Sequence, residues 1–222
     1  MRYDAVLFDL DDTLTVTRVV KFAMHKAIAR ERHGRTLTDA DIAAHYDLPL
    51  EQSLRALHGT PETPAADLFA LLDRYQPRFP HRAQPDALTV VGALLAAGLD
   101  VGVVTGSPES VARPVLAALG FPVARMLGVY CYNSAHLRKP DPAVFAEACA
   151  TLRARHAPRE PTIVYVGDAL VDLRAARGAG IDFLGVTSGT VDAVAFRNAG
   201  ADRCVPDLTA ALRAVLPGER PR

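Results

Sequence analysis

The sequence predicts an α/β fold in which a doubly wound parallel sheet carries a small all-α domain inserted after its first strand. Residues 5–8 form an uninterrupted apolar run, which is typical of a buried strand. Residues 15–84 show only the spacing of amphipathic helices, and from residue 85 onward apolar runs alternate with helical segments. Because strands that alternate with helices form parallel sheets covered on both faces, the later part of the chain is expected to complete the sheet begun at residue 5.

The first strand, residues 5–8, runs directly into carboxylates at Asp9, Asp11 and Asp12. Asp9 is expected at the strand end and Asp11 on the turn above it, so the two can face one pocket. Carboxylates held this close repel each other, and a hard divalent cation such as Mg²⁺ relieves the repulsion. The alternative interpretation is a polar turn that ends a core strand.

The helical insert is expected to cover residues 15–84, and residues 1–14 with 85–222 are expected to form the α/β core. The first helix of the insert contains Val19 and Ile28 and stops at Gly34, a second starts at Thr38, and two more cover residues 50–57 and 64–75. An insert of roughly 70 residues is too long for a loop in a compact domain, so we expect a small domain of its own.

Beyond the insert, helices and strands are expected to alternate. Further strands are predicted at residues 99–104, 126–132, 162–166 and 183–186 and around Cys204, and helices at 86–97, 109–119, 140–155, 171–177, 192–198 and 207–216. Polar residues follow three of the predicted strands directly. They are Asp9 after residues 5–8, Thr105 after residues 99–104, and Gly167-Asp168 after residues 162–166. Because ligands bind beyond the carboxyl ends of parallel strands, these residues are expected to converge on one site.

The composition narrows the classes of function. A formal net charge of zero without a basic run argues against a nucleic-acid binder. No apolar run approaches the roughly 18 residues of a membrane helix, and no signal-like segment precedes the first strand, so we expect a soluble cytoplasmic protein without a membrane partner. The cysteines, Cys131, Cys149 and Cys204, lack metal-ligand spacing and are expected to be reduced thiols.

Lysine is scarce, because only Lys21, Lys26 and Lys139 occur among 25 basic residues. A compact ammonium does different work from a planar guanidinium, so each lysine is a candidate for a specific role. Chance retention is the alternative for any one of them.

The chain contains four short motifs whose identity and order resemble the signature motifs of the haloacid dehalogenase superfamily. They are Asp9-Leu10-Asp11-Asp12-Thr13, then Thr105, then Lys139-Pro140-Asp141-Pro142, and finally Gly167-Asp168 with Asp172. The resemblance extends from residue 4 to about residue 190, and Asp12 stands where glycine is common in the family. It implies a Rossmann-like core with the helical cap of the phosphoglycolate phosphatase-like subgroup. Dehalogenating relatives need no metal and lack an aspartate at the position of Asp11, so Asp11 favours phosphate chemistry.

The motif residues suit phosphoryl transfer, which needs an in-line nucleophile and neutralisation of the phosphoryl charge. Asp9 is the candidate nucleophile and would form an aspartyl-phosphate, while Asp11 is the candidate acid for the leaving oxygen and base for water. Thr105 and the backbone N–H of Gly106 are expected to bind phosphate oxygens, and Lys139 to place its charge on the phosphate and Asp9. The structural alternatives are a helix cap for Thr105 and a surface lysine for Lys139.

The resemblance also implies a magnesium site formed by Asp9, the backbone carbonyl of Asp11, and Asp168. Asp172 falls four residues after Asp168 on a helical turn, so it is expected to face the same site and hold a metal-bound water. The alternative for Asp172 is a helix-start acid that stabilises the helix dipole.

The insert lies where the phosphoglycolate phosphatase-like and β-phosphoglucomutase-like enzymes carry their cap. Residues 47–54 resemble that cap segment, but Leu50 stands where mutase-like members often have arginine, and Asp47 where they have glycine. Lys21 and His25 lie one turn apart on the polar side of the first cap helix, where solvent exposure is the favoured interpretation and substrate contact the alternative. Recognition of the leaving group stays open.

The sequence thus predicts a Mg²⁺-dependent phosphatase that hydrolyses a small phosphorylated metabolite, phosphoglycolate-like or a sugar phosphate, with a phosphosugar mutase as the alternative. A response-regulator-like module is excluded because Thr105 and Lys139 precede the second acidic pair, Asp168 and Asp172. A nicotinamide-binding domain fits the sequence poorly because no G-x-G-x-x-G follows the first strand. A monomer and a homodimer both fit the sequence.

Overall fold

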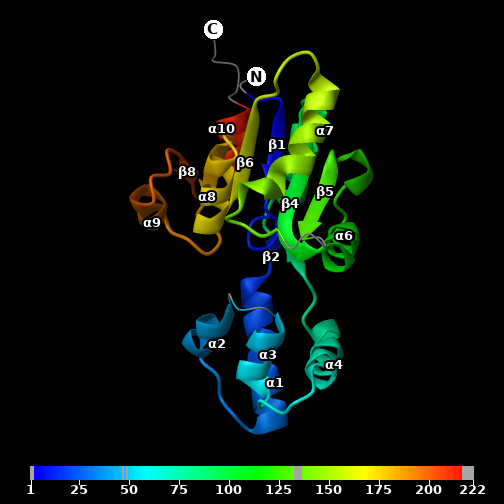
Figure 1. The fold of residues 1–222 in the computed structure, drawn as a ribbon, viewed down its shortest axis with the longest axis vertical. Helices are drawn as coiled ribbons and strands as arrows, with labels where there is room; N and C mark the ends of the chain where they lie inside the picture. Colours follow the sequence, from blue (N-terminus) through cyan, green and yellow to red (C-terminus); the bar gives the residue numbers. More distant parts are fainter. Residues whose placement is uncertain (1–2, 47, 49, 133–136, 217–222) are drawn as a thin grey trace. The chain divides into compact units, whose positions relative to one another are not determined.

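The computed structural model describes residues 3–46, 48, 50–132 and 137–216. The chain divides into two compact units, which we call the core unit (residues up to Val16 and from Arg82 onward) and the helical unit (Thr17–His81) (Figure 1). The sequence places the corresponding domain limits at residues 14/15 and 84/85. The assignment of the helical unit as a cap stays a prediction.

A six-stranded sheet with the strand order β5-β4-β1-β6-β7-β8 forms the centre of the core unit (Figure 1). Its strands are β1 (Ala5–Phe8), β4 (Asp100–Pro108), β5 (Gly128–Tyr132), β6 (Ile163–Gly167), β7 (Asp182–Val186) and β8 (Cys204–Val205). All neighbouring strands run parallel. Phe8 at the end of β1 lies opposite Val103 of β4 and Val166 of β6, so three strands that end in the predicted motifs are adjacent.

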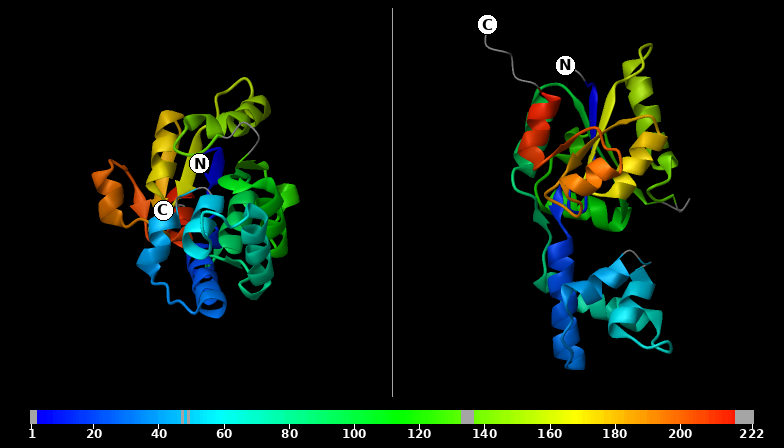
Figure 2. Two further views of the ribbon diagram at one scale, coloured as in Figure 1. Left: turned by 60° about the horizontal axis from the view of Figure 1, so that its bottom comes forward. Right: turned by 90° about the vertical axis from the view of Figure 1, so that its left-hand side faces the viewer.

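Helices cover both faces of this sheet, which confirms the predicted doubly wound α/β fold. One face carries α5 (Ala87–Ala96), α6 (Glu109–Ala118) and α10 (Leu208–Val215), and the other carries the 3₁₀ turn Pro142–Phe145, α7 (Ala146–His156) and α8 (Leu170–Gly178). The right-hand view of Figure 2 shows α10 and α8 on opposite sides of the strands. Alternation along β1 explains the two apolar layers, because Val6 and Phe8 join one cluster and Leu7 the other. The short helix α9 (Ala193–Asn198) follows β7.

Two short strands, β2 (Thr15–Val16) and β3 (Arg82–Ala83), form a separate antiparallel pair in the core unit. They pair the chain segments that lead into and out of the helical unit. The structure differs here from the expectation of helices alone between residues 15 and 84. Strands of two residues are too short to show an alternating pattern, so no sequence signal marks them.

The helical unit consists of α1 (Arg18–His33), α2 (Asp39–Tyr46), α3 (Leu50–His58) and α4 (Ala65–Tyr75), followed by a 3₁₀ turn at Gln76–Arg78. The predicted stop of α1 is correct, because Gly34 adopts the left-handed conformation with φ of 60°. The predicted start of α2 is also correct. Thr38 Oγ1 donates to Asp41 Oδ2 at 2.7 Å, and the N–H of Asp41 donates back to Thr38 Oγ1 at 3.2 Å.

Two further expectations concern the whole chain. In the described part of the protein, no helix combines the length and apolar character needed to cross a bilayer. Cys131, Cys149 and Cys204 are free thiols, as expected from their spacing.

Candidate active site

The candidate site lies in the core unit, at the carboxyl ends of β1 and β6. The N–H of Asp9 donates to the carbonyl of Val166 at 2.9 Å, so the ladder between the two strands continues one residue past β1. Asp9 therefore has a fixed backbone, and its side chain follows the face of Leu7 in the alternation of β1. Asp168 follows the last residue of β6 directly.

Lys139 joins two of the predicted aspartates. Its Nζ lies 2.6 Å from Asp9 Oδ1 and 2.6 Å from Asp172 Oδ1, and its side chain is only 10 % exposed. The ammonium also donates to the hydroxyl of Tyr165 at 2.9 Å. Lys139 is therefore a buried member of the site, which contradicts the alternative of a surface lysine.

Asp168 is held by two threonines. Thr13 Oγ1 donates to Asp168 Oδ1 at 2.9 Å, and both the N–H and the hydroxyl of Thr190 donate to Oδ2 at 2.8 Å. Gly189 allows this close approach, because a Cβ there would lie 2.3 Å from the Cβ of Asp168. The carboxylate of Asp168 is thus fixed from two loops.

Asp172 lies in the first turn of α8 and is completely buried. Its Oδ2 accepts from the N–H of Ala169 at 3.0 Å, which closes the first turn of the helix, and its Oδ1 accepts from Lys139. Asp172 therefore has both roles. One carboxylate oxygen stabilises the start of α8, and the other contacts Lys139 in the site.

Asp11 and Thr105 meet through a serine that the sequence did not single out. Ser107 Oγ donates to Asp11 Oδ2 at 2.6 Å, and its N–H donates to Thr105 Oγ1 at 3.0 Å. Thr105 is buried, whereas Gly106 is exposed and a Cβ there would meet no atom within 4 Å. The helix α6 starts after Pro108 without a side-chain cap, so Thr105 does not cap it.

The electrostatics of the site are dominated by buried negative charge. Burial raises the pKa of Asp9 well above its ordinary value, and the charges of Asp172, Asp168 and Asp11 add to the rise against the opposing charge of Lys139. Burial, with the charge of Asp172, also raises the pKa of Asp168 to about 6. Burial alone would lower the pKa of Lys139, but the carboxylates of Asp172 and Asp9 outweigh it and hold that pKa well above its ordinary value.

The carboxylates fit a hard divalent cation. Oxygens of Asp9, Asp168 and Asp172 lie within 4.8 Å of one another, and two of these carboxylates contact the Lys139 ammonium. Carboxylate oxygens are ligands that Mg²⁺ prefers, and a divalent charge would relieve the repulsion that helps to raise the pKa values of Asp9 and Asp168. Asp172, which the sequence predicts to hold a metal-bound water, is as close to the group as the two predicted ligands. The predicted use of the Asp11 backbone carbonyl stays a prediction.

Three residues near the site carried no sequence prediction of their own: Ser107, Tyr165 and Thr190. Ser107 stands two residues after Thr105, so the motif itself could have suggested it. Thr190 follows the end of β7 in a polar loop, the usual place for a ligand-binding residue in a parallel sheet. Tyr165 is a polar-tipped residue in an apolar strand, a weaker signal, because aromatic residues are common in strands.

The helical unit contains the two residues considered for substrate contact. His25 is buried and its Nδ1 lies 2.9 Å from His58 Nε2, so the interpretation of His25 as a solvent-exposed residue is wrong. Its helix face packs against α3, which helical spacing alone does not reveal. Lys21 is half-buried, with Nζ 5.9 Å from the centroid of the Tyr46 ring. Contact of either residue with substrate stays a prediction. Of the predicted cap segment, Asp47 and Pro49 lie outside the described residues.

Comparison with known proteins agrees with this geometry. Residues 6–186 match the family of haloacid dehalogenase-like hydrolases. The N-acetylmuramic acid 6-phosphate phosphatase of Pseudomonas aeruginosa is 31% identical over 208 residues, covering 86% of this chain and 84% of the relative. The phosphoglycolate phosphatase of Cereibacter sphaeroides is 33% identical over 196 residues, covering 83% of this chain and 85% of the relative.

Solved structures show the same fold. A predicted phosphoglycolate phosphatase from Haemophilus somnus has a TM-score of 0.80 at 20% identity, covering 97% of this chain and 99% of that one. A hydrolase from Pseudomonas syringae has a TM-score of 0.68 at 25% identity, covering 96% of this chain and 97% of that one. The family match covers all four predicted motifs, and the curated relatives described above are named phosphatases. The chain therefore belongs to the haloacid dehalogenase-like hydrolases.

Proposed function

We propose that the protein is a Mg²⁺-dependent phosphatase that hydrolyses a small phosphorylated metabolite through an aspartyl-phosphate on Asp9. The observation that carries the proposal is the buried contact of Lys139 with Asp9 and Asp172, beside Asp168 at the ends of two parallel strands. This group offers a carboxylate nucleophile, a cation for phosphoryl oxygens and oxygen ligands for a metal.

Asp9 is the proposed nucleophile. Lys139 holds its Oδ1, and we assign the attack on phosphorus to Oδ2. The new bond joins Oδ2 to phosphorus while the ester bond between phosphorus and the leaving oxygen breaks. In the second step, water attacks phosphorus, the bond to Asp9 breaks, and inorganic phosphate leaves.

Asp11 is the proposed acid and base. It protonates the leaving oxygen in the first step and takes a proton from the attacking water in the second. Ser107 donates to Asp11 Oδ2 at 2.6 Å and so fixes the orientation of this carboxyl group near Thr105. We thus assign proton transfer to Asp11, in the loop after β1, and not to the buried Asp168 or Asp172.

Thr105 and Gly106 are the proposed hydrogen-bond donors to the phosphate, and Lys139 is the proposed positive charge that attracts it. Thr105 Oγ1 already accepts a hydrogen bond from Ser107, which leaves its own hydrogen for a phosphate oxygen. The ammonium of Lys139 places a positive charge beside Asp9, where the phosphoryl group would be transferred.

Asp9 and Asp168, with the backbone carbonyl of Asp11, would hold the metal, and Asp172 would hold a metal-bound water. When bound, Mg²⁺ neutralises charge on the phosphoryl oxygens and so allows an anionic carboxylate to approach an anionic ester. Thr13 and Thr190 keep Asp168 oriented toward this group through the hydrogen bonds described above.

The substrate class is proposed from the relatives. Their names specify phosphoglycolate and N-acetylmuramic acid 6-phosphate, and both are phosphate esters of an organic acid. We therefore propose a small phosphorylated acid or sugar phosphate as the substrate. A phosphosugar mutase would return the phosphoryl group to the sugar, whereas the relatives named here release it.

The test is hydrolysis of 4-nitrophenyl phosphate with and without Mg²⁺, followed by a panel that contains both named substrates. We expect metal-dependent phosphate release that falls by at least about 10³-fold in Asp9→Asn, because the nucleophile is lost. Asp4→Asn is the matched control. Asp4 precedes the same strand at its other end, where it pairs with Arg159. Equal activity of Asp9→Asn and the wild type, or release without any metal, would contradict the proposal.

A further inference from the structure

A buried phenol joins three parts of the candidate site. Tyr165 lies in the middle of β6, and its side chain is completely buried. Its hydroxyl lies 2.9 Å from Lys139 Nζ and 2.8 Å from the carbonyl oxygen of Val104. We infer that Tyr165 is a positioning residue whose hydroxyl holds the Lys139 ammonium against Asp9. The inference deepens the proposed function and rests on it for its catalytic consequence.

The direction of each hydrogen bond is determined by chemistry. An ammonium has no lone pair, so the Tyr165 hydroxyl must accept from Lys139. The phenol then has one hydrogen to donate. Val104 O at 2.8 Å is the partner, because the alternative acceptor, Asp172 Oδ1, is 3.4 Å away. The hydroxyl is thus oriented by its donor and its acceptor together.

These contacts also use every hydrogen-bond donor of the Lys139 ammonium. Lys139 has three N–H donors, and it has three acceptors within 2.9 Å: Asp9 Oδ1, Asp172 Oδ1 and Tyr165 Oη. A lysine side chain has four flexible carbons, so contacts with two carboxylates alone would leave the ammonium free to move between them. The phenol supplies the neutral third contact that restricts this movement without adding negative charge.

The ring of Tyr165 is itself held rigidly. It packs edge-on against Phe145 with ring centroids 4.8 Å apart, within the apolar cluster that contains Leu7 and Ala148. Its acceptor, Val104, immediately precedes Thr105, the candidate phosphate ligand. One side chain therefore links β6 to β4 and, through Lys139, to Asp9 after β1.

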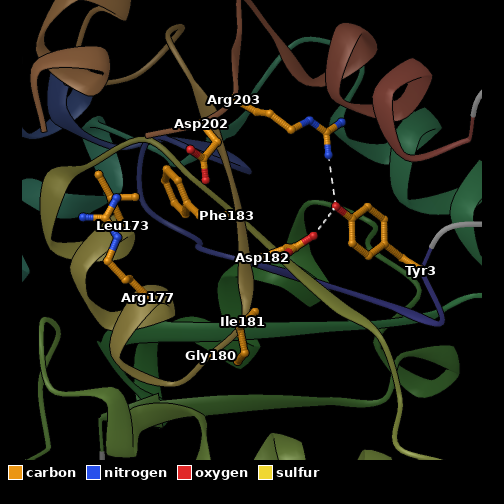
Figure 3. Close-up of a pocket in the computed structure, with 9 residues that line it drawn as sticks. All are labelled: Tyr3, Leu173, Arg177, Gly180, Ile181, Asp182, Phe183, Asp202 and Arg203. Carbon is orange, nitrogen blue, oxygen red and sulfur yellow. Dashed lines mark hydrogen bonds between the residues drawn. The ribbon is translucent and has the colours of Figure 1, made fainter. Parts of the chain in front are cut away.

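Tyr3 provides a matched control for the loss of a buried phenolic hydroxyl (Figure 3). Its hydroxyl donates to Asp182 Oδ2 at 2.7 Å and accepts from Arg203 at 3.0 Å, so it too bridges a charged donor and an acceptor. Tyr3 is 3 % exposed and precedes β1, at the end of the strand opposite to Asp9. Tyr3→Phe and Tyr165→Phe therefore remove the same atom from similar surroundings, and only one of the two touches the site.

The first measurement is independent of catalysis. The chain has three lysines, so the ammonium signals in a ¹⁵N NMR spectrum are few, and Lys139→Met identifies the signal of Lys139. We expect a slowly exchanging Lys139 signal in the wild type and in Tyr3→Phe. In Tyr165→Phe its hydrogen exchange should accelerate by about tenfold, because one of three hydrogen bonds is lost.

The second measurement is steady-state kinetics on 4-nitrophenyl phosphate. Tyr165→Phe should lower kcat by about 10-fold to 100-fold with little change in KM, as expected when the partner of a catalytic group is removed. Tyr3→Phe should keep the wild-type kcat. In a Lys139→Met background, Tyr165→Phe should have no further effect, because the hydroxyl acts through the ammonium. 4-Aminophenylalanine at position 165 keeps a polar group there, should restore part of kcat, and serves as the test variant if Tyr165→Phe does not fold.

The outcomes separate this inference from the proposed function. Faster exchange at Lys139 in Tyr165→Phe supports the positioning role even if the wild type releases no phosphate, a result that would overturn the proposed function alone. Unchanged ammonium exchange in Tyr165→Phe would overturn the inference. An equal loss of kcat in Tyr3→Phe would also overturn it, because the effect would then belong to the stability of the core unit.

Discussion

At the scale of single residues, the acidic group depends on hydrogen-bond donors that hold it in place. Asp168 has one oxygen bonded to Thr13 and the other to Thr190, so its carboxylate cannot turn without breaking a contact. These two threonines come from loops 155 and 22 residues away from Asp168 along the chain. Donors of this kind would fix the orientation of Asp168 as a proposed metal ligand.

Removal of one donor is expected to weaken metal binding. Thr190→Val keeps the shape of the side chain but removes the hydroxyl on Asp168 Oδ2, so the Mg²⁺ concentration for half-maximal activity should rise by about 10-fold to 100-fold. Metal titration of phosphate release measures this shift. Thr187→Val, in the same loop with its hydroxyl toward the carbonyl of Val205, is the control. A shift of the same size in both variants would refute the specific role of Thr190.

Some of the residues of the candidate site could be predicted from the sequence, and others could not. Asp9, Lys139, Asp168 and Asp172 were singled out from motifs and strand ends, and the structure brings them together. Tyr165 was not, because its role depends on contacts between residues distant in the chain, whereas Ser107 and Thr190 have weak local signals in the motif after Thr105 and the loop after β7. Asp12 adopts φ of 61°, which explains why its position suits glycine and tolerates aspartate.

At the scale of elements, two histidines join α1 and α3 in the helical unit. His25 and His58 are both buried, and their facing nitrogens are 2.9 Å apart, so one ring donates and the other accepts. Within the described residues, His58 Nδ1 is a buried nitrogen without a hydrogen-bond partner. A hydrogen on His58 Nε2, donated to His25, leaves this nitrogen as an unused acceptor rather than an unsatisfied donor.

The pair is expected to make the helical unit sensitive to acid. Burial lowers the pKa of His25 to about 4, with help from the charge of Lys21, and lowers that of His58 to about 3, with help from His25, His33 and Arg35. Both folded-state values lie below the unfolded value of 6.5, so the stability from the neutral pair is complete above pH 6.5. This stability should be lost as the pH falls from 6.5 toward 4 and below. For His25, the loss in the free energy of unfolding is on the order of 3 kcal/mol.

Hydrogen exchange of the α1 and α3 amides between pH 7 and pH 4 measures this loss, after correction for the intrinsic exchange rate. The double variant His25→Phe/His58→Phe should flatten the pH dependence, because both groups whose pKa values are lowered by burial are then gone. His45→Gln, on α2 of the same unit, should leave the dependence intact. Steep acid sensitivity that persists in the double variant would show that other groups cause it.

Most helices and strands were predictable because start and stop signals flank them. The strand Ala5–Phe8 has the predicted bounds, and α6 ends one residue before the predicted Leu119. β4 continues past the predicted Val104 to Pro108, because pairing with β5 resumes at Tyr132 after an irregular register. A register shift of this kind depends on the partner strand, so a single segment of sequence cannot reveal it.

At the scale of the whole molecule, the short pair β2 and β3 joins the ends of the helical unit. Val16 lies opposite Arg82 in an antiparallel register, so the two ends of the core chain are adjacent. Strands in this register can be joined by a two-residue turn such as Asn-Gly. The chain of the core unit could therefore be closed by a short turn in place of the helical unit.

Replacement of residues 17–81 by Asn-Gly should therefore leave a folded core unit. We expect it to unfold cooperatively, to keep the protected Lys139 ammonium signal and to hydrolyse 4-nitrophenyl phosphate with Mg²⁺. It should lose discrimination among phosphorylated acids if the helical unit acts as a cap. Circular dichroism melting and the substrate panel measure these properties. A core that fails to fold would contradict the independence of the two units.

The most direct measurement is the capture of the covalent intermediate. Rapid acid quench during turnover with Mg²⁺, followed by peptide mass spectrometry, should locate a phosphoryl group on Asp9 in the tryptic peptide that ends at Arg18. The label should be absent in Asp9→Asn. Turnover with an unlabelled peptide, or a phosphoryl group on any residue other than Asp9, would contradict the assignment of the nucleophile.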